Sequence, residues 1–164
     1  MNVTSHAEPQ VDPDRPPNSG AHMSLPSSPH VLVVDDETTI RISLRRFFER
    51  LGWVVDEATD GDSALELLLS SGRDRGVPDF HAVICDVRMP GLDGVGLHER
   101  LQRERPDLLS RLIFVTGDMM SDDVALFLES TWCLVLQKPF EFAQLQDLMI
   151  RLMDDGATPE ALAS

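Results

Sequence analysis

The sequence predicts an α/β domain built around a five-stranded, doubly wound parallel sheet with five helices. Between residues 30 and 153, five short apolar runs alternate with longer stretches whose apolar residues recur at helical spacing. The runs are rich in Val and Ile and apolar at consecutive positions, which is typical of strands covered by helices on both faces. Five βα units in series favour an open sheet with right-handed crossovers.

The five predicted strands are the apolar runs themselves. They are Val31–Val34, Trp53–Ala58, Ala82–Cys85, Leu112–Val115 and Leu134–Leu136. In sheets of this kind ligands bind at the carboxyl ends of the strands. We therefore look for function in the residues that directly follow each run.

The first three predicted helices each have a stop signal. The first ends at Gly52, and its apolar face consists of Ile40, Leu44, Phe47, Phe48 and Leu51. Asp62 or Asp60 can cap the second, which ends at Gly72. Asp93 opens the third, which ends at Pro106 and whose apolar residues are Val95, Leu97 and Leu101.

The last two predicted helices follow the fourth and fifth strands. Ser121 caps the fourth helix, whose apolar residues are Val124, Leu126, Phe127 and Leu128. The fifth starts near Glu141, and its apolar residues are Leu145, Leu148 and Leu152.

Composition divides the chain into three segments. Residues 1–29 contain six of the eleven prolines and no periodicity, so we expect a disordered leader or linker. Residues 30–153 form the predicted domain, and residues 154–164 a flexible acidic tail. The 164 residues are enough for one domain with a real core.

Charge and cysteine content exclude several classes of protein. The net charge of −14 disfavours a nucleic-acid binder, because phosphate contacts need clustered Lys and Arg. No apolar run approaches the length that spans a bilayer, and no signal peptide is visible. Cys85 and Cys133 lack the spacing of a zinc site or a disulfide framework. We expect a soluble, cytoplasmic protein.

Polar residues that suit phosphoryl chemistry follow four of the predicted strands. Asp35 and Asp36 follow the first strand, and Asp86 follows the third. Thr116 follows the fourth, and Lys138, the only lysine of the chain, follows the fifth. Any one of them has an ordinary explanation as a cap or turn residue. Their occurrence together at four strand ends is poorly explained by chance.

These residue types together favour a divalent cation and a phosphoryl group. Crowded carboxylates repel one another, and a hard cation such as Mg²⁺ relieves the repulsion while keeping ligand positions for phosphate oxygens. Thr116 offers a hydroxyl and Lys138 a compact positive charge for phosphoryl oxygens. Asp86 suits the role of nucleophile, because a carboxylate can carry phosphate as an acyl phosphate.

Four segments resemble the receiver domain of two-component response regulators. They are Val31–Glu37 (VLVVDDE), Asp86–Gly94 (DVRMPGLDG), Val115–Gly117 (VTG) and Lys138–Phe140 (KPF). The intervals of 30 residues from Asp86 to Thr116 and 22 from Thr116 to Lys138 are also similar to those of the family. The resemblance covers nearly all of the predicted domain.

The resemblance implies a flavodoxin-like fold with strand order 2-1-3-4-5 and a role for each site residue. Asp86 would accept a phosphoryl group from a phosphohistidine on a sensor histidine kinase or a phosphotransfer protein. Asp35, Asp36, Asp86 and the backbone carbonyl of Arg88 would hold Mg²⁺. Thr116 and Lys138 would bind phosphoryl oxygens, and the Lys138–Pro139 bond resembles the family's cis peptide.

The resemblance also implies how the module would signal. It would catalyse its own phosphorylation and slow dephosphorylation without turning over a small substrate. Only eleven residues follow the fifth helix, so we expect a stand-alone module whose output is contact with an unidentified protein. Alternatively, the chain is the receiver segment of a longer hybrid kinase. By analogy, that output surface, and that of any homodimer, comprises the fourth helix, fifth strand and fifth helix.

Three features depart from the common pattern of the family. The segment 70–79 is longer than usual, which we interpret as a surface insertion. Val135 stands where an aromatic residue usually couples to the threonine, and the chain has no tyrosine. Arg88 and Asp118 each lie two residues after a site residue, and we hypothesise that they pair across the mouth of the site and limit water access.

Two other functions remain open from the sequence. A docking domain that keeps the fold without phosphorylation gains some weight from Val135. A haloacid-dehalogenase-like phosphatase would use Asp35 as nucleophile but would leave Asp86 without a role. His98-Glu99-Arg100 superficially resembles a kinase phosphoacceptor box, and we interpret His98 as a surface histidine.

Overall fold

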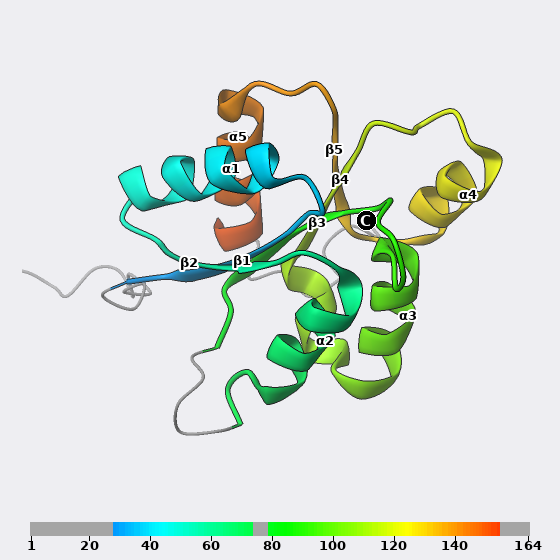
Figure 1. Cartoon of the computed structure of the whole chain (residues 1–164), viewed down its shortest axis with the longest axis horizontal. Coiled ribbons are helices and arrows are strands. Elements are labelled where there is room, and N and C mark those ends of the chain that lie inside the picture. The colour runs from blue at the N-terminus through cyan, green and yellow to red at the C-terminus, as the bar shows by residue number, and fades with distance from the viewer. Residues whose placement is uncertain (1–27, 74–78, 155–164) are drawn as a thin grey trace, which may run out of the picture.

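The computed structural model describes residues 28–73 and 79–154, which form one parallel sheet flanked by helices (Figure 1). The strand order is β2-β1-β3-β4-β5, as predicted. The strands are β1 His30–Val34, β2 Val54–Ala58, β3 Ala82–Asp86, β4 Leu112–Thr116 and β5 Leu134–Gln137. All neighbouring strands pair in parallel, so their carboxyl ends share one edge.

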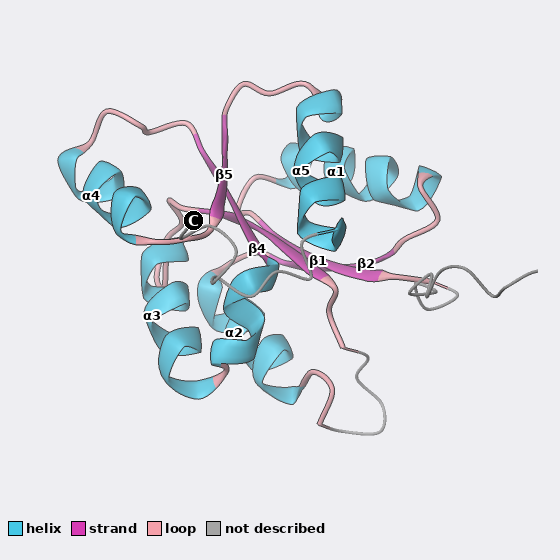
Figure 2. Cartoon of the chain, turned by 180° about the vertical axis from the view of Figure 1, so that it is seen from behind, coloured by secondary structure: helices cyan, strands magenta, loops and turns pink. Residues whose placement is uncertain are grey.

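Helices cover both faces of this sheet, as the two opposite views show (Figures 1 and 2). Helices α1 and α5 lie on one face, and α2, α3 and α4 lie on the other. The helices are α1 Thr38–Arg50, α2 Gly61–Ser70, α3 Gly94–Glu104, α4 Asp122–Ser130 and α5 Phe142–Asp154. A short 3₁₀ helix, Pro106–Arg111, connects α3 to β4 and was not predicted.

The core lies in two layers, one on each side of the sheet. Strands β1, β3 and β4 are buried along their whole length, whereas the edge strands β2 and β5 are only partly buried. Alternate strand residues therefore face opposite layers: Val31 and Val33 pack with α1 and α5, while Leu32 and Val34 pack with α2 and α3. This confirms the inference that apolar runs of this kind are strands covered on both faces.

The helix caps agree with the sequence at two of three positions. The Oδ1 atom of Asp60 accepts the Ser63 N–H at 2.8 Å, so Asp60 rather than Asp62 caps α2. The Oδ1 atom of Asp93 accepts the Gly96 N–H at 2.9 Å, as predicted for α3. Ser121 occupies the N-cap position of α4, as predicted, but its side chain makes no capping hydrogen bond to the helix backbone.

Two apolar residues assigned to the inner faces of helices are instead exposed. Leu51 follows the last turn of α1 and is 44% exposed. Leu126 of α4 is 66% exposed, and Val124 is the only residue of α4 that is buried. Helical spacing identified the helix correctly but overestimated how much of it packs against the sheet.

The domain limits stay a prediction, because most of residues 1–29 and 154–164 lie outside the described part of the chain. Described secondary structure runs from β1 to α5, close to the predicted limits of 30 and 153. The centre of the predicted insertion, residues 74–78, also lies outside the described residues. None of the described helices has the length and apolar character needed to cross a membrane.

Candidate functional site

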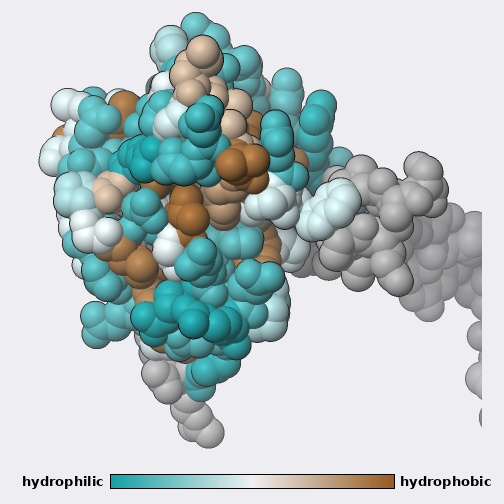
Figure 3. Space-filling view, turned by 90° about the vertical axis from the view of Figure 1, so that its right-hand side faces the viewer, coloured by the Kyte–Doolittle hydropathy of each residue, from teal (hydrophilic) through white to brown (hydrophobic). Residues whose placement is uncertain are grey.

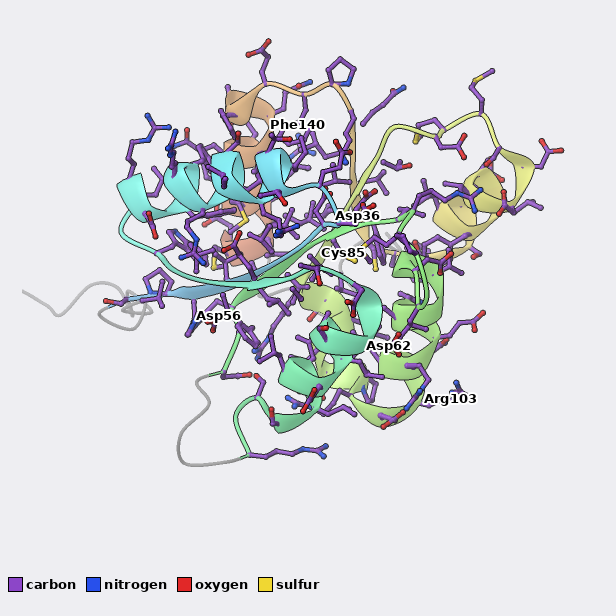
Figure 4. All side chains as sticks on the ribbon, in the orientation of Figure 1. Asp36, Asp56, Asp62, Cys85, Arg103 and Phe140 are labelled. Atoms are coloured by element: carbon purple, nitrogen blue, oxygen red, sulfur yellow. The ribbon has the colours of Figure 1, made fainter. Side chains whose placement is uncertain are left out.

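Three carboxylates meet at the carboxyl edge of the sheet. Asp35 and Asp36 follow β1, and Asp86 is the last residue of the adjacent strand β3. One oxygen from each carboxylate lies within 4.8 Å of the others. Figure 4 shows Asp36 at this edge, whereas Arg103 lies near the end of α3 that is farther from it. The structure thus brings together the three aspartates that were predicted, with the backbone carbonyl of Arg88, as metal ligands.

Lys138 supplies the positive charge beside these acids. Its backbone N–H donates to the Thr116 carbonyl at 2.8 Å, which places it just beyond the paired end of β4 and β5. Its Nζ atom lies 3.1 Å from Asp35 Oδ2 and 3.4 Å from Asp86 Oδ2. The Lys138–Pro139 peptide bond is cis, as the resemblance implied. We call the group Asp35, Asp36, Asp86 and Lys138 the acidic pocket.

Burial sets the electrostatics of the acidic pocket. Desolvation raises the pKa of Asp86, Lys138 opposes this effect, and the nearby Asp35 adds to it. For Lys138, desolvation lowers the pKa, but the attraction of Asp86 and Asp35 outweighs it and the net pKa is raised. Lys138 is therefore a firmly charged cation, and the carboxylates around it gain from any further positive charge.

The backbone around the acidic pocket fixes the direction of each group. Asp35 is buried, and its Oδ1 atom accepts the Glu37 N–H at 2.8 Å. Asp36 is exposed, and one of its carboxylate oxygens lies within 4.8 Å of an oxygen of Asp35 and of Asp86. The Arg88 N–H donates to Asp86 Oδ1 at 3.3 Å, which tethers the loop after β3 to the carboxylate.

Gly94 allows helix α3 to start directly against this loop. Its N–H donates to the Val87 carbonyl at 2.9 Å. A Cβ atom at Gly94 would lie 2.7 Å from the Asp86 carbonyl oxygen and 2.8 Å from Val87 Cα, both backbone atoms. Only glycine fits this close approach, so α3 begins directly against the backbone of Asp86 and Val87.

Thr116 is the last residue of β4 and is completely buried. Its Oγ1 atom accepts the Asp118 N–H at 3.0 Å, so the hydroxyl proton remains available for an acceptor in the site. Strand β4 lies between β3 and β5: Val115 pairs with Asp86 of β3, and Thr116 pairs with Gln137 of β5. Thr116 therefore lies between the strand that ends with Asp86 and the strand that Lys138 follows. Val135 is half-buried in β5, so no aromatic ring occupies the position that usually couples to this threonine.

Arg88 lies at the mouth of the acidic pocket and contacts the start of α4. Its Nη2 atom is 3.4 Å from Asp118 Oδ2, so the hypothesised pair is present. The same atom also donates to Ser121 Oγ at 2.8 Å and to Asp123 Oδ1 at 3.0 Å. We call Arg88, Asp118, Ser121 and Asp123 the mouth cluster. The sequence did not reveal the Ser121 and Asp123 contacts, which depend on how α4 is placed.

His98 is not the surface histidine that the sequence suggested. It is half-buried, and its ring contacts Phe127 edge-on with a centroid distance of 5.3 Å. Phe127 makes a similar contact with the buried Phe114 of β4. Burial lowers the pKa of His98 and outweighs the opposing charge of Glu99. His98 therefore packs α3 against α4 as a neutral ring.

The sequence profile of the response regulator receiver domain matches residues 31–150, which is most of the chain. The chain belongs to this family. It is 40% identical over 136 residues to the response regulator MprA of Mycolicibacterium vanbaalenii and 34% identical over 137 residues to the aerobic respiration control protein ArcA of Escherichia coli K12. These alignments cover 80% and 81% of this chain but 55% and 53% of the relatives, so the chain spans about half their length.

Solved structures agree with this receiver domain assignment. The receiver domain of the Francisella response regulator 1452 is 26% identical, with a TM-score of 0.63 over 77% of this chain and 98% of that one. A receiver domain of a signal transduction histidine kinase from Syntrophus aciditrophicus is 25% identical, with a TM-score of 0.66 over 84% and 98%. The receiver domain of PA1611 from Pseudomonas aeruginosa, solved with magnesium in its active-site cleft, shares the fold at 24% identity, with a TM-score of 0.66 over 77% and 98%.

Family membership decides several of the alternatives. This is a receiver domain of two-component response regulators, and such domains are not turnover enzymes for small substrates. The haloacid-dehalogenase-like phosphatase is thereby set aside. Receiver domains in general bind Mg²⁺ and interact with histidine kinases or phosphotransfer proteins, and the acidic pocket of this chain has the oxygen ligands for such a cation.

Proposed function

We propose that this receiver domain is a phosphoacceptor module in which Asp86 takes a phosphoryl group from a phosphohistidine of a sensor histidine kinase or phosphotransfer protein. The observation that carries the proposal is the position of Lys138 Nζ, 3.1 Å from Asp35 and 3.4 Å from Asp86. A single cation held between two buried carboxylates, at the edge where three carboxylates meet, suits a site that stabilises extra negative charge.

The transfer itself exchanges one bond to phosphorus for another. An Asp86 carboxylate oxygen attacks the phosphorus atom, the O–P bond forms and the N–P bond breaks. The electron pair of the broken bond stays on the ring nitrogen that carried the phosphoryl group, and a proton on the other ring nitrogen makes the leaving group a neutral histidine. Lys138 Nζ, which lies 3.4 Å from Asp86 Oδ2, and the Thr116 hydroxyl would donate to oxygens of the transferred group, where negative charge gathers.

The acidic pocket fits Mg²⁺ by the chemistry of its oxygen atoms. Asp35, Asp36, Asp86 and the backbone carbonyl of Arg88 would hold the ion, since Mg²⁺ binds through a few carboxylates and keeps other positions for water or phosphate. When bound, the ion would supply positive charge to the phosphoryl oxygens. Of the three aspartates, Asp36 is exposed to solvent, whereas Asp35 and Asp86 are buried.

The output of the module would be protein–protein contact in the cytoplasm. The surface we assign to it, for a downstream protein or for a homodimer, comprises α4, β5 and α5. Leu126 of α4, Ile150 of α5 and Trp132, which lies between α4 and β5, are exposed. Figure 3, which looks onto the side where α4 lies, shows apolar side chains among polar ones. We propose neither a nucleic-acid nor a membrane partner.

Intact-mass measurement tests the proposed function directly. The full chain is incubated with acetyl phosphate and Mg²⁺, beside Asp86→Asn and a matched Asp62→Asn control on α2. We expect one added phosphoryl group in the wild type and in Asp62→Asn, and none in Asp86→Asn or without Mg²⁺.

Two other outcomes would redirect the assignment. If a second receiver domain is phosphorylated in the same reaction and this chain is not, the chain is a docking domain that keeps the fold, the alternative that Val135 favours. If Asp86→Asn is modified as fully as the wild type, Asp86 is not the phosphoacceptor.

A further inference from the structure

Arg88 links the acidic pocket to helix α4 through two different parts of one residue. Its backbone N–H donates to Asp86 Oδ1, while its guanidinium reaches across the mouth to Asp118, Ser121 and Asp123. Asp123 lies in the first turn of α4. Any change at Asp86 that attracts the guanidinium therefore acts on the start of α4.

Packing holds α4 less firmly than the neighbouring helix α3. Helix α3 buries Leu97 and Leu101 and has a side-chain cap at Asp93. Helix α4 buries only Val124 and has no side-chain cap. The mouth cluster therefore fastens an end of α4 that has little other support.

The ion pairs of the mouth cluster are weak enough for Arg88 to exchange them for another anion. Asp118 and Asp123 each form an ion pair with Arg88, and the Ser121 hydroxyl donates to Asp118 Oδ2 at 2.7 Å. Their pairs with Arg88 are open to solvent, where water and salt weaken an ion pair. A phosphoryl group offers a guanidinium several charged oxygens at once and repels nearby carboxylates.

We propose that Arg88 is a latch whose guanidinium exchanges Asp118 and Asp123 for the phosphoryl group on Asp86, and that this exchange frees the first turn of α4. The inference rests on the proposed function of Asp86. It gives the receiver domain a route from phosphorylation to α4 that needs no aromatic side chain at Val135. Arg88 acts in this route as a positioning residue for α4.

Hydrogen–deuterium exchange of the peptide spanning residues 118–130 measures the latch in the full chain. In the wild type, phosphorylation by acetyl phosphate with Mg²⁺ should speed exchange in the first turn of α4 about threefold, the size of effect typical of solvent-exposed ion pairs. Arg88→Ala should show this faster exchange before phosphorylation and little further change after it. Arg88→Lys, which keeps the charge but loses the planar fork, should restore part of the protection.

Two matched controls separate the latch from a general loss of charge. Asp123→Asn should loosen α4 as Arg88→Ala does, whereas Asp122→Asn should not, because Asp122 is in the same turn but outside the mouth cluster. Arg103→Ala should also leave exchange unchanged, because Arg103 makes no ion pair with any residue in the described part of the chain. Figure 4 shows it far along α3 from the site.

The intact mass of each exchange sample distinguishes failure of the latch from failure of the proposed function. If Asp86 carries the phosphoryl group and exchange in α4 stays the same, the latch is wrong and the proposed function stands. Equal exchange in Arg88→Ala and the wild type before phosphorylation also overturns the latch. If no phosphoryl group is added at all, the proposed function fails and the latch fails with it.

Discussion

The acidic pocket and the mouth cluster contain ion pairs of nearly equal length in very different surroundings. Lys138 lies 3.1 and 3.4 Å from its two aspartates, and Arg88 lies 3.0 and 3.4 Å from its own. The Lys138 side chain is 18% exposed, whereas the Asp123 side chain is 68% exposed. Because solvent screens charges, the buried pairs are suited to holding a reacting group in place, and the exposed pairs to changing partners.

Removal of Lys138 should produce the largest effect on the acidic pocket. Lys138→Ala leaves Asp35 and Asp86 without their shared cation, and we expect the rate of phosphorylation by acetyl phosphate to fall about 100-fold or more, as when other preorganised electrostatic groups are removed. Intact mass against time measures the rate. A fall of less than about threefold would mean that the buried cation contributes little, with Arg103→Ala as the control.

Gly94 and Gly117, which lie beside the two clusters, should differ in how much an alanine substitution destabilises the fold. Gly94→Ala forces Cβ against the backbone of Asp86 and Val87, and we expect a loss of about 1–3 kcal/mol in the free energy of unfolding together with slower phosphorylation. Gly117→Ala meets only Lys138 Cβ at 3.8 Å, an ordinary contact, and should change stability by less than about 0.5 kcal/mol. Urea unfolding measures the stability of both variants. Equal losses would mean that the close backbone approach at Gly94 does not restrict the start of α3.

High salt should affect the two clusters differently. At about 1 M NaCl the screening length falls to about 3 Å, so the exchange difference between Arg88→Ala and the wild type in α4 should disappear. The rate difference between Lys138→Ala and the wild type should persist under the same conditions, because Lys138, Asp35 and Asp86 are shielded from solvent. A latch that survives high salt would show that its pairs are better shielded than their exposure indicates.

The smallest expected effect concerns the packing of α4 through His98. Because burial lowers its pKa, the neutral ring is favoured in the folded state, and its contribution to stability is fully present above about pH 6.5. The contribution is lost as the pH falls through the lowered pKa, so acidification should destabilise the wild type. His98→Phe should reduce this pH dependence in urea unfolding without removing it, since burial also lowers the pKa of His81. An unchanged pH dependence would mean that His98 is solvated.

The sequence predicted the parts of the site that depend on strand ends and missed those that depend on helix placement. Asp35, Asp86, Thr116 and Lys138 could be found because parallel strands carry their carboxyl ends to one edge. The contact of Arg88 with Asp123 could not, because it depends on where α4 lies above the sheet. Helical periodicity alone cannot fix that placement.

The same limit explains the errors at individual helix residues. Ser121 has the residue type of a cap, but its hydroxyl donates to Asp118 Oδ2 at 2.7 Å. His98 is polar, and the sequence predicts it at the surface, but its ring contacts two phenylalanines from other elements. For Ser121 a hydrogen bond to a residue three positions earlier replaces the cap, and for His98 contacts with distant elements outweigh the preference of a polar residue for the surface.

Reductive trapping of the phosphorylated residue tests the central claim most directly. Borohydride converts an aspartyl phosphate to homoserine, so tandem mass spectrometry of the treated protein identifies the residue that carried the phosphoryl group. We predict homoserine at position 86 in the wild type after reaction with acetyl phosphate and Mg²⁺, and at no other position. Homoserine at position 35 or 36 would contradict the assignment of Asp86 as the phosphoacceptor.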